Sequence, residues 1–308
     1  MIEIFLKTLP FFAIIGLGYS ACRSGFFPEI ASAWLTKFVF YFALSAMLFG
    51  FASSLPVAEI FNAQFALAYL AGCFFVYIIA TLIALIRKRG IEEAAIEAQV
   101  ATIGNAGFLG VPMFVTLFGV AAAGPAIMVL ALDLVVFSSL IVILITVARE
   151  GRMRLAVMGT VCLGLLKNPM IVSMAAGLAV AAMGWQLPLV VREFTDILGG
   201  AATPGALFAI GASLAGKSAE RVSVAIWLSF LKLAVHPLAV YIAAFHIFDV
   251  DPFAAMIMVS ASALPVAGNV YILAQHYGVA PQRVSASILI STVISVLTVT
   301  LTIAMLQG

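Results

Sequence analysis

Two short clusters of asparagine, glycine and proline lie inside apolar stretches of the chain. The first reads GNAGFLGVP at 104–112, and the second reads SALPVAGN at 262–269. Such residues interrupt helices, and an unpaired backbone N–H or C=O group in hydrocarbon is costly. A helix that restarts after a break presents free N–H groups and the positive end of its dipole, where an anion can bind. The predicted chemistry is therefore anion recognition without a basic side chain.

The candidate binding residues all come from these two clusters. The side-chain amides of Asn105 and Asn269 are expected to complete the site. The alternative interpretation is structural, because prolines also kink helices and glycines also allow close packing. Two similar clusters at matching depth favour the binding site. Its predicted members are Asn105, Gly107, Gly110, Pro112, Pro265, Gly268 and Asn269.

Three ionisable residues, Asp133, Lys232 and His236, also fall deep inside apolar stretches. Ionisable groups at such depth are rare and are by default functional candidates. A pair between Asp133 and Lys232 would offset part of the desolvation penalty, and His236 lies one helical turn after Lys232. The three residues predict either proton coupling and substrate steering or a buried pair that fixes helix packing. Asn168, which precedes Pro169, is instead expected to satisfy local backbone groups.

The elements that carry these residues are predicted to be membrane-spanning helices. Of the 308 residues, 65% are hydrophobic and only 9% are charged, whereas soluble domains carry about 25% charged residues. The sequence predicts an all-α polytopic membrane protein. Ten apolar stretches are long enough to span a bilayer: 4–21, 31–51, 63–86, 95–118, 124–147, 164–183, 197–215, 222–245, 253–277 and 284–306.

Basic residues predict the orientation of these helices. With an external N-terminus, ten Lys and Arg residues fall on inward loops, and only Lys7 and Arg192 fall on the outward side. Both termini are therefore expected outside the cytoplasm, in a protein of the inner membrane. The inward set is Arg23, Arg87, Lys88, Arg89, Arg149, Arg152, Arg154, Lys217, Arg221 and Arg283.

An internal repeat is predicted at an offset of 159 residues. This offset aligns Pro10 with Pro169, Gly18 with Gly177, Gly25 with Gly184, Phe49 with Phe208, and Gly119 with Gly278. The predicted units are 1–150 and 151–308, each with five helices. Because five is odd, the two copies must be inverted, which is the architecture of many secondary transporters. The two interrupted helices, the fourth and the ninth, are then equivalent.

Other function classes are disfavoured. Cys22, Cys73 and Cys162 have neither CxxC spacing nor histidines nearby, and are read as core residues without a metal. An intramembrane enzyme is not expected, since no HExxH or GxSxG motif is present, and no P-loop indicates ATP as a direct energy source. No cofactor is predicted, and the net charge of +2 is too small to indicate nucleic-acid binding.

The sequence resembles the auxin efflux carrier family over essentially its whole length. The resemblance rests on NAGFLGVPMFVTLFG, the NP before the sixth apolar stretch, ATPGALFAIGASLAG and LPVAGNVYILAQHYG. It implies ten helices in two inverted repeats, related in fold to the bile acid sodium symporters, with the fourth and ninth helices crossing at their prolines. It also implies a scaffold of helices one, two, six and seven, a transport domain of the others, and a substrate carboxylate beside the crossing.

The leading hypothesis is a secondary transporter of a small organic anion, such as malonate, malate or an auxin-like acid. It would work by elevator-like alternating access, with H⁺ or Na⁺ as a conceivable coupling ion. The nearest alternative is a sodium symporter of the bile-acid type, because unwound carbonyls could hold Na⁺. A passive anion channel is a weaker alternative. Membrane lipid is an expected partner, and the sequence leaves a homodimer open.

Overall fold

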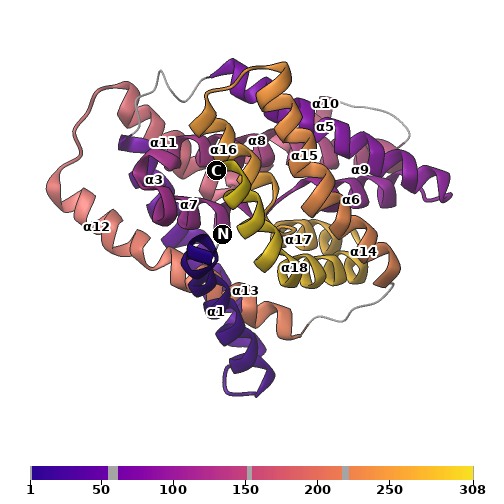
Figure 1. Cartoon of the computed structure of the whole chain (residues 1–308), viewed down its shortest axis with the longest axis horizontal. Helices are drawn as coiled ribbons and strands as arrows, with labels where there is room; N and C mark the ends of the chain where they lie inside the picture. The colour runs from indigo at the N-terminus through magenta and orange to yellow at the C-terminus, as the bar shows by residue number, and fades with distance from the viewer. Residues whose placement is uncertain (1, 55–61, 151–154, 217–221, 308) are drawn as a thin grey trace.

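The computed structural model describes residues 2–54, 62–150, 155–216 and 222–307, which form helices and one isolated β-bridge (Figure 1). Among these residues, seven helices are long and apolar enough to cross a bilayer, and a bent pair makes an eighth. Two shorter apolar helices, Ala106–Phe118 and Pro252–Ser262, belong to the fourth and ninth predicted stretches. The class of polytopic α-helical membrane protein is confirmed, whereas the count of ten spans stays a prediction.

The helices follow one another with short connections, and several contain a π-turn, labelled η. The first half contains α1 (Ile2–Arg23), α2 (Glu29–Phe38), η1 (Val39–Ala43), α3 (Leu44–Ser54), α5 (Ala63–Ile86), α6 (Ile91–Thr102), η2 (Ala106–Gly110), α7 (Val111–Phe118), the 3₁₀ turn η3 (Val120–Ala122), α8 (Ala123–Leu132), η4 (Asp133–Phe137) and α9 (Ser138–Glu150). The second half contains α10 (Leu155–Lys167), α11 (Pro169–Ala182), α12 (Leu189–Gly200), α13 (Ala202–Ala215), α14 (Val222–Phe230), η5 (Leu231–Val235), α15 (His236–Ile242), η6 (Ala243–Ile247), α16 (Pro252–Ser262), α17 (Gly268–Tyr277) and α18 (Pro281–Gln307).

The sixth and seventh predicted stretches begin earlier than the sequence indicates. Helix α10 starts at Leu155 and turns by 74° into α11 at Asn168. The following proline causes this bend, because it lacks an N–H and disfavours helical geometry in the residue before it. The Oδ1 atom of Asn168 accepts from the N–H of Met170 at 3.0 Å, so Asn168 caps α11 as expected. Helix α12 begins at Leu189, and its polar face explains why hydropathy alone missed it.

Four glycines with positive φ support the predicted repeat. Gly25 and Gly184 have φ angles of 79° and 64°, and Gly119 and Gly278 have φ angles of 81° and 69°. The members of each pair are 159 residues apart. Because glycine adopts this conformation without a steric penalty, the chain can turn in the same way at equivalent positions of the two halves. The repeat itself stays a prediction.

Close packing of helices from different halves follows the same offset. Helix α1 lies along α13, and α11 lies along α3 (Figure 1). A Cβ atom on Gly18 would lie 2.2 Å from the carbonyl oxygen of Phe208, and one on Gly177 would lie 2.7 Å from that of Phe49. Glycine is therefore needed at both positions, because the neighbouring backbone occupies the space of a side chain.

Several predicted inward basic residues are paired at one end of the molecule. Glu97 is fully buried, and its carboxylate accepts hydrogen bonds from Arg87 and Arg283. Arg149 pairs with Glu92 at 2.8 Å. These ion pairs join the ends of α5, α6, α9 and α18, so this end of the bundle is held together electrostatically. Four other predicted inward residues lie outside the described part of the chain: Arg152, Arg154, Lys217 and Arg221.

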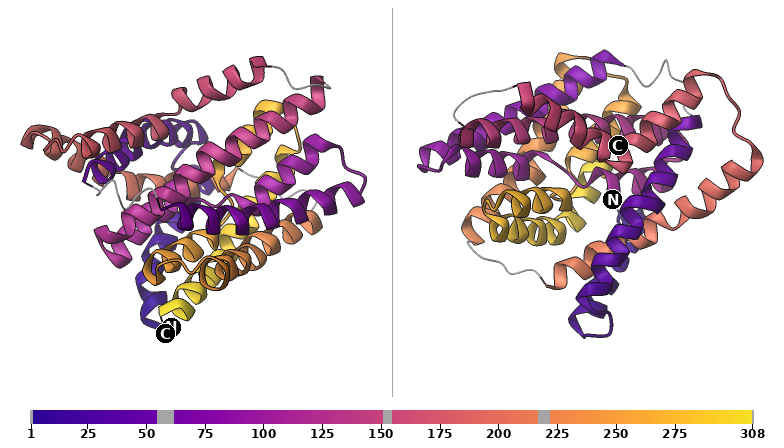
Figure 2. Two further views of the ribbon diagram at one scale, coloured as in Figure 1. Left: turned by 90° about the horizontal axis from the view of Figure 1, so that it is seen from above. Right: turned by 180° about the vertical axis from the view of Figure 1, so that it is seen from behind.

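The described ends of the chain lie together at the opposite end. The Oγ1 atoms of Thr8 in α1 and Thr300 in α18 are 2.8 Å apart and buried. Figure 2 shows the N- and C-terminal helices meeting there. Both ends are thus on one side of the molecule, as an even number of spans requires. Which side of the membrane this is stays a prediction.

The α1–α13 contact predicts a difference between two glycines of α1. Gly18→Ala should destabilise the protein by about 1–3 kcal/mol, because its methyl group meets the backbone of α13. Gly16→Ala is the matched control, since no heavy atom lies within 4 Å of its added Cβ. Thermal unfolding of both variants in detergent measures the difference. Equal unfolding temperatures would contradict the predicted close contact.

Candidate functional site

The first interrupted helix unwinds between α6 and η2. Helix α6 ends at Thr102, and Ile103 has extended geometry with ψ of 115°. The chain then restarts through the π-turn η2 and α7, where Pro112 lies in the first turn. A proline is tolerated there, because N–H groups of the first turn have no intrahelical acceptor. The break therefore lies just before the stretch from Asn105 to Pro112 rather than in its middle.

The second interrupted helix unwinds at Ala263–Ala267, between α16 and α17, and its backbone pairs with that of the first. Gly104 and Val266 form an antiparallel β-bridge. The N–H of Asn105 donates to the carbonyl of Pro265 at 2.9 Å, and the N–H of Ala267 donates to the carbonyl of Ile103 at 3.1 Å. One N–H group and one C=O group of each break are thus satisfied by the other break, which lowers the penalty of unwinding in a low-dielectric interior. The structure brings the two predicted clusters together.

The side chains of the two predicted asparagines are free for a ligand. Within the described residues, neither the Asn105 nor the Asn269 amide has a hydrogen-bond partner, and the Oδ1 atom of Asn269 is buried and unsatisfied. Asn105 precedes η2, and Asn269 is in the first turn of α17. The buried Asn269 Oδ1 atom needs a donor, whereas an anion can bond only to the N–H groups of the two amides.

The predicted glycines and prolines of the site have different surroundings. A Cβ on Gly107 would lie 2.6 Å from Met170 Cε, and one on Gly110 would lie 2.7 Å from Leu264 Cδ1, so both glycines allow close packing. Gly268 instead faces open space at the start of α17. Pro265 is buried in the second break, and Pro112 lines a cavity that is described below.

Lys232 and His236 form a buried polar network directly behind the bridge. The Nζ atom of Lys232 donates to the carbonyl of Ser262 at 2.6 Å and lies 2.9 Å from His236 Nδ1. Because an ammonium group only donates, Nδ1 accepts, and Nε2 carries the proton that points toward Cys73 Sγ at 3.1 Å. A Cβ on Gly104 would lie 3.1 Å from Nζ, so glycine leaves room for the lysine.

Asp133 belongs to the same buried region but does not pair directly with Lys232. Its Oδ1 atom accepts from the hydroxyl of Tyr69 at 2.8 Å, and its Oδ2 atom has no partner. The side chains of Asp133, Lys232 and His236 are at most 3% exposed. Sequence reasoning missed Tyr69 and Cys73, because their surroundings are apolar and their partners are far along the chain. Their spacing of four residues in α5, one helical turn, was the available signal.

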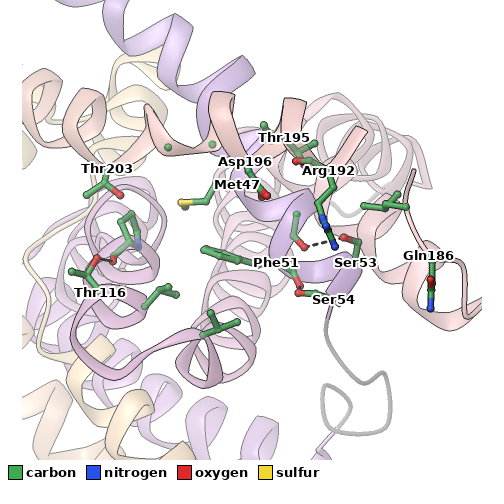
Figure 3. A pocket seen from close by; sticks show the side chains of 18 of the residues that line it. Met47, Phe51, Ser53, Ser54, Thr116, Gln186, Arg192, Thr195, Asp196 and Thr203 are labelled. Atoms are coloured by element: carbon green, nitrogen blue, oxygen red, sulfur yellow. Dashed lines mark hydrogen bonds between the residues drawn. The ribbon is translucent and has the colours of Figure 1, made fainter. Parts of the chain in front are cut away.

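A cavity of about 740 Å³ lies beside the second half of the first interrupted helix (Figure 3). Its walls come from α3, α7, α12, α13 and the segment before α12. Pro112 and Thr116 of α7 contribute to the lining, as do Arg192 and Asp196 of α12. By the predicted orientation, this cavity opens to the outer face.

Comparisons with known proteins point to transport rather than to catalysis. Residues 3–303 match a protein family described as membrane transport protein. The chain is 33% identical over 306 residues to a protein of Rhizobium meliloti (strain 1021) named "Putative malonate transporter". The alignment covers 97% of this chain and 95% of that relative.

The buried network predicts a stability defect in Tyr69→Phe. The variant should lose about 1.5–3 kcal/mol, because the Asp133 carboxyl group would lose its hydrogen bond. Tyr241→Phe is the control, since Tyr241 is exposed on α15. Chemical denaturation in detergent measures both. A loss of stability in Tyr241→Phe as large as that in Tyr69→Phe would contradict a specific role for this bond.

Proposed function

Because the chain belongs to the membrane transport protein family, in agreement with the resemblance to the auxin efflux carriers, we propose that it is a secondary active carrier of small carboxylates. The substrate anion binds beside the paired breaks and crosses the membrane by elevator-like alternating access. Transport needs no cofactor. The protein spans the inner membrane with both termini outside the cytoplasm.

The observation that carries this proposal is the pairing of the two breaks beside two unpartnered amides. Asn105 and Asn269 each lie at the start of a restarted helix, where the first N–H groups have no acceptor in the preceding turn of the same helix. The N–H groups of Asn105, Ala106 and Val270 already bond to nearby carbonyls, so the side-chain amides and the helix dipoles are the main attraction for an anion. Amide N–H groups and the positive helix ends attract a carboxylate. An anion can therefore be bound without direct contact to a lysine or arginine side chain.

Helix packing supports a division into two moving parts. Helices α1 and α13 form one close pair, α3 and α11 form another, and α2, η1 and α12 link the two pairs. Helices α5, α6, α14, α15, α16 and α18 form a second packed group. We propose that the first group is the scaffold and that the second, with both interrupted helices, is the transport domain. The units 1–150 and 151–308 each contribute helices to both parts.

The position of Lys232 favours a carrier that does not use sodium. Sodium in an unwound helix would be held by backbone carbonyls. The ammonium of Lys232 already bonds to the Ser262 carbonyl at 2.6 Å, next to the second break. A fixed positive charge there also disfavours a bound cation by repulsion. Proton coupling through Asp133 or His236, or movement driven by the membrane potential, fits this arrangement better.

Malonate is the first substrate to test, because the relative from Rhizobium meliloti is named "Putative malonate transporter". Uptake into proteoliposomes should be measured with Na⁺, pH and membrane potential varied separately. We expect saturable malonate transport without a sodium requirement. A strict sodium requirement would favour the symporter alternative, and single-channel currents far above carrier turnover would contradict a carrier.

Substitution of the two free asparagines predicts a loss of binding without a loss of stability. Asn105→Ala and Asn269→Ala should each weaken carboxylate binding by about tenfold or more, since a hydrogen bond to a charged group contributes about 1.5–3 kcal/mol. The measurement is the ligand-dependent rise in unfolding temperature across a panel of carboxylates and auxin-like acids.

Asn168→Ala is the matched control for these variants. It removes the cap of α11 and should lower stability by about 1 kcal/mol while leaving binding intact. Unchanged binding in Asn105→Ala for every ligand that stabilises the natural protein would contradict the site.

A further inference from the structure

The cavity beside α7 contains an arginine that has no partner in the described part of the chain. Arg192 is exposed on α12, and no ion pair or hydrogen bond of its guanidinium group is present there. Figure 3 shows its side chain extending toward the end of α3 that carries Ser53 and Ser54. The described lining also contains Asp196, so its formal net charge is zero, and the positive potential is local to the guanidinium group of Arg192.

Hydroxyl-bearing side chains line both sides of the cavity (Figure 3). Besides the two serines, the lining contains Thr116, Thr195 and Thr203, which come from three different helices. The hydroxyls of Ser53, Ser54, Thr116 and Thr195 already donate to backbone carbonyls of their own helices. The guanidinium group of Arg192 is therefore the main donor of the lining, and it can bind a carboxylate with two parallel hydrogen bonds. A volume of about 740 Å³ is ample for a small acid with its water.

Pro112 connects this cavity to the paired breaks. It lines the cavity and lies seven residues after Asn105 on the same interrupted helix. At about 1.5 Å per helical residue, the two positions are roughly 10 Å apart. An anion beside Pro112 in the cavity would therefore be close to the proposed binding site.

We propose that this cavity is an outer vestibule that collects carboxylate anions through Arg192 and favours dicarboxylates over monocarboxylates. This inference rests on the proposed carrier function, and it adds a second anion site with its own charge selectivity. The Coulomb energy between a substrate and Arg192 is proportional to the number of its carboxylates. A dicarboxylate is therefore attracted about twice as strongly as a monocarboxylate. Asp196, one helical turn further along α12, opposes Arg192 and limits the strength of the site.

Kinetic measurements on opposite charge changes test the vestibule. Arg192→Gln should raise the KM for malonate about threefold to tenfold, with little change in maximal rate, because Arg192 lines the cavity rather than the paired breaks, so its charge acts mainly on encounter. Asp196→Asn should lower the KM. Monomethyl malonate carries one charge, so each substitution should change its KM by about the square root of the factor by which it changes the KM for malonate.

Two control variants separate charge from other effects. Arg23→Gln removes an exposed arginine outside the cavity and should leave the KM unchanged. Glu193→Gln removes an exposed acid of α12 that does not line the cavity, and it should lower the KM less than Asp196→Asn does. Gly200 lines the cavity, and a Cβ there meets no atom within 4 Å, so Gly200→Leu should fold and narrow the vestibule. Its effect should be the same for singly and doubly charged substrates.

A labelling experiment tests the vestibule without any transport. Ser53→Cys provides a thiol in the cavity, in a background where Cys22 and Cys162 are replaced by serine and only the buried Cys73 remains. The rates of modification by an anionic and a cationic methanethiosulfonate are compared by mass spectrometry. Arg192→Gln should lower the ratio of anionic to cationic rates about threefold or more, and Asp196→Asn should raise it.

The outcomes distinguish this inference from the proposed function. If neither Arg192→Gln nor Asp196→Asn changes the ratio of anionic to cationic labelling rates, the vestibule is overturned, even if malonate is transported. An Arg192 effect on KM that occurs in vesicles with anionic lipid but not in pure phosphatidylcholine would assign Arg192 to lipid binding and also overturn it. Absence of carboxylate transport in the natural protein, with charge-dependent labelling intact, would instead contradict the carrier.

Discussion

The hydrogen bonds between the two unwound segments are the interaction on which the rest of the structure depends. Each segment would be unstable alone in an apolar interior, because its N–H and C=O groups would have no partner. Paired as Asn105 with Pro265 and Ala267 with Ile103, they are satisfied without water. Two helices can therefore end and restart inside the protein, and their free helix starts are held next to each other.

The surroundings of the bridge reflect this requirement. Gly104 has no side chain, and the Lys232 ammonium group occupies the space beside it. Gly110 lets Leu264 of the second break approach the first restarted helix. Behind the bridge, the lysine and His236 are fully buried and hydrogen-bonded in series. A partly satisfied polar network is a sensitive element, because losing one member leaves its neighbours unpaired.

The sequence predicted those features that follow from local chemistry or from repetition. The Asn, Gly and Pro clusters predicted the two breaks, and NP predicted the cap at Asn168. The sequence could not indicate that Asp133 bonds to Tyr69 instead of Lys232, because that choice depends on how α5 packs against α8 and η4. It also missed the start of α12, where charged residues lower the hydropathy, and the start of α10, which is apolar although the predicted stretch began only at residue 164.

The cavity shows a further limit of sequence reasoning. Arg192 was counted only as an outward charge, and nothing in its neighbours along the chain indicates that α3, α7 and α13 enclose the same space. The position of an arginine relative to a cavity is a property of tertiary packing. Its functional interpretation therefore depends on the structure, whereas that of Asn105 was already accessible from its proline and glycine neighbours.

The close contacts of Gly18 with Phe208 and of Gly177 with Phe49 have a consequence for biosynthesis. Each contact joins helices that are made far apart in time, since α1 leaves the ribosome long before α13. The groove at Gly18 and the backbone of α3 at Phe49 therefore lack their protein partners until the second half is made. Neither half can complete its packing alone, so the chain commits to its final assembly only late in translation.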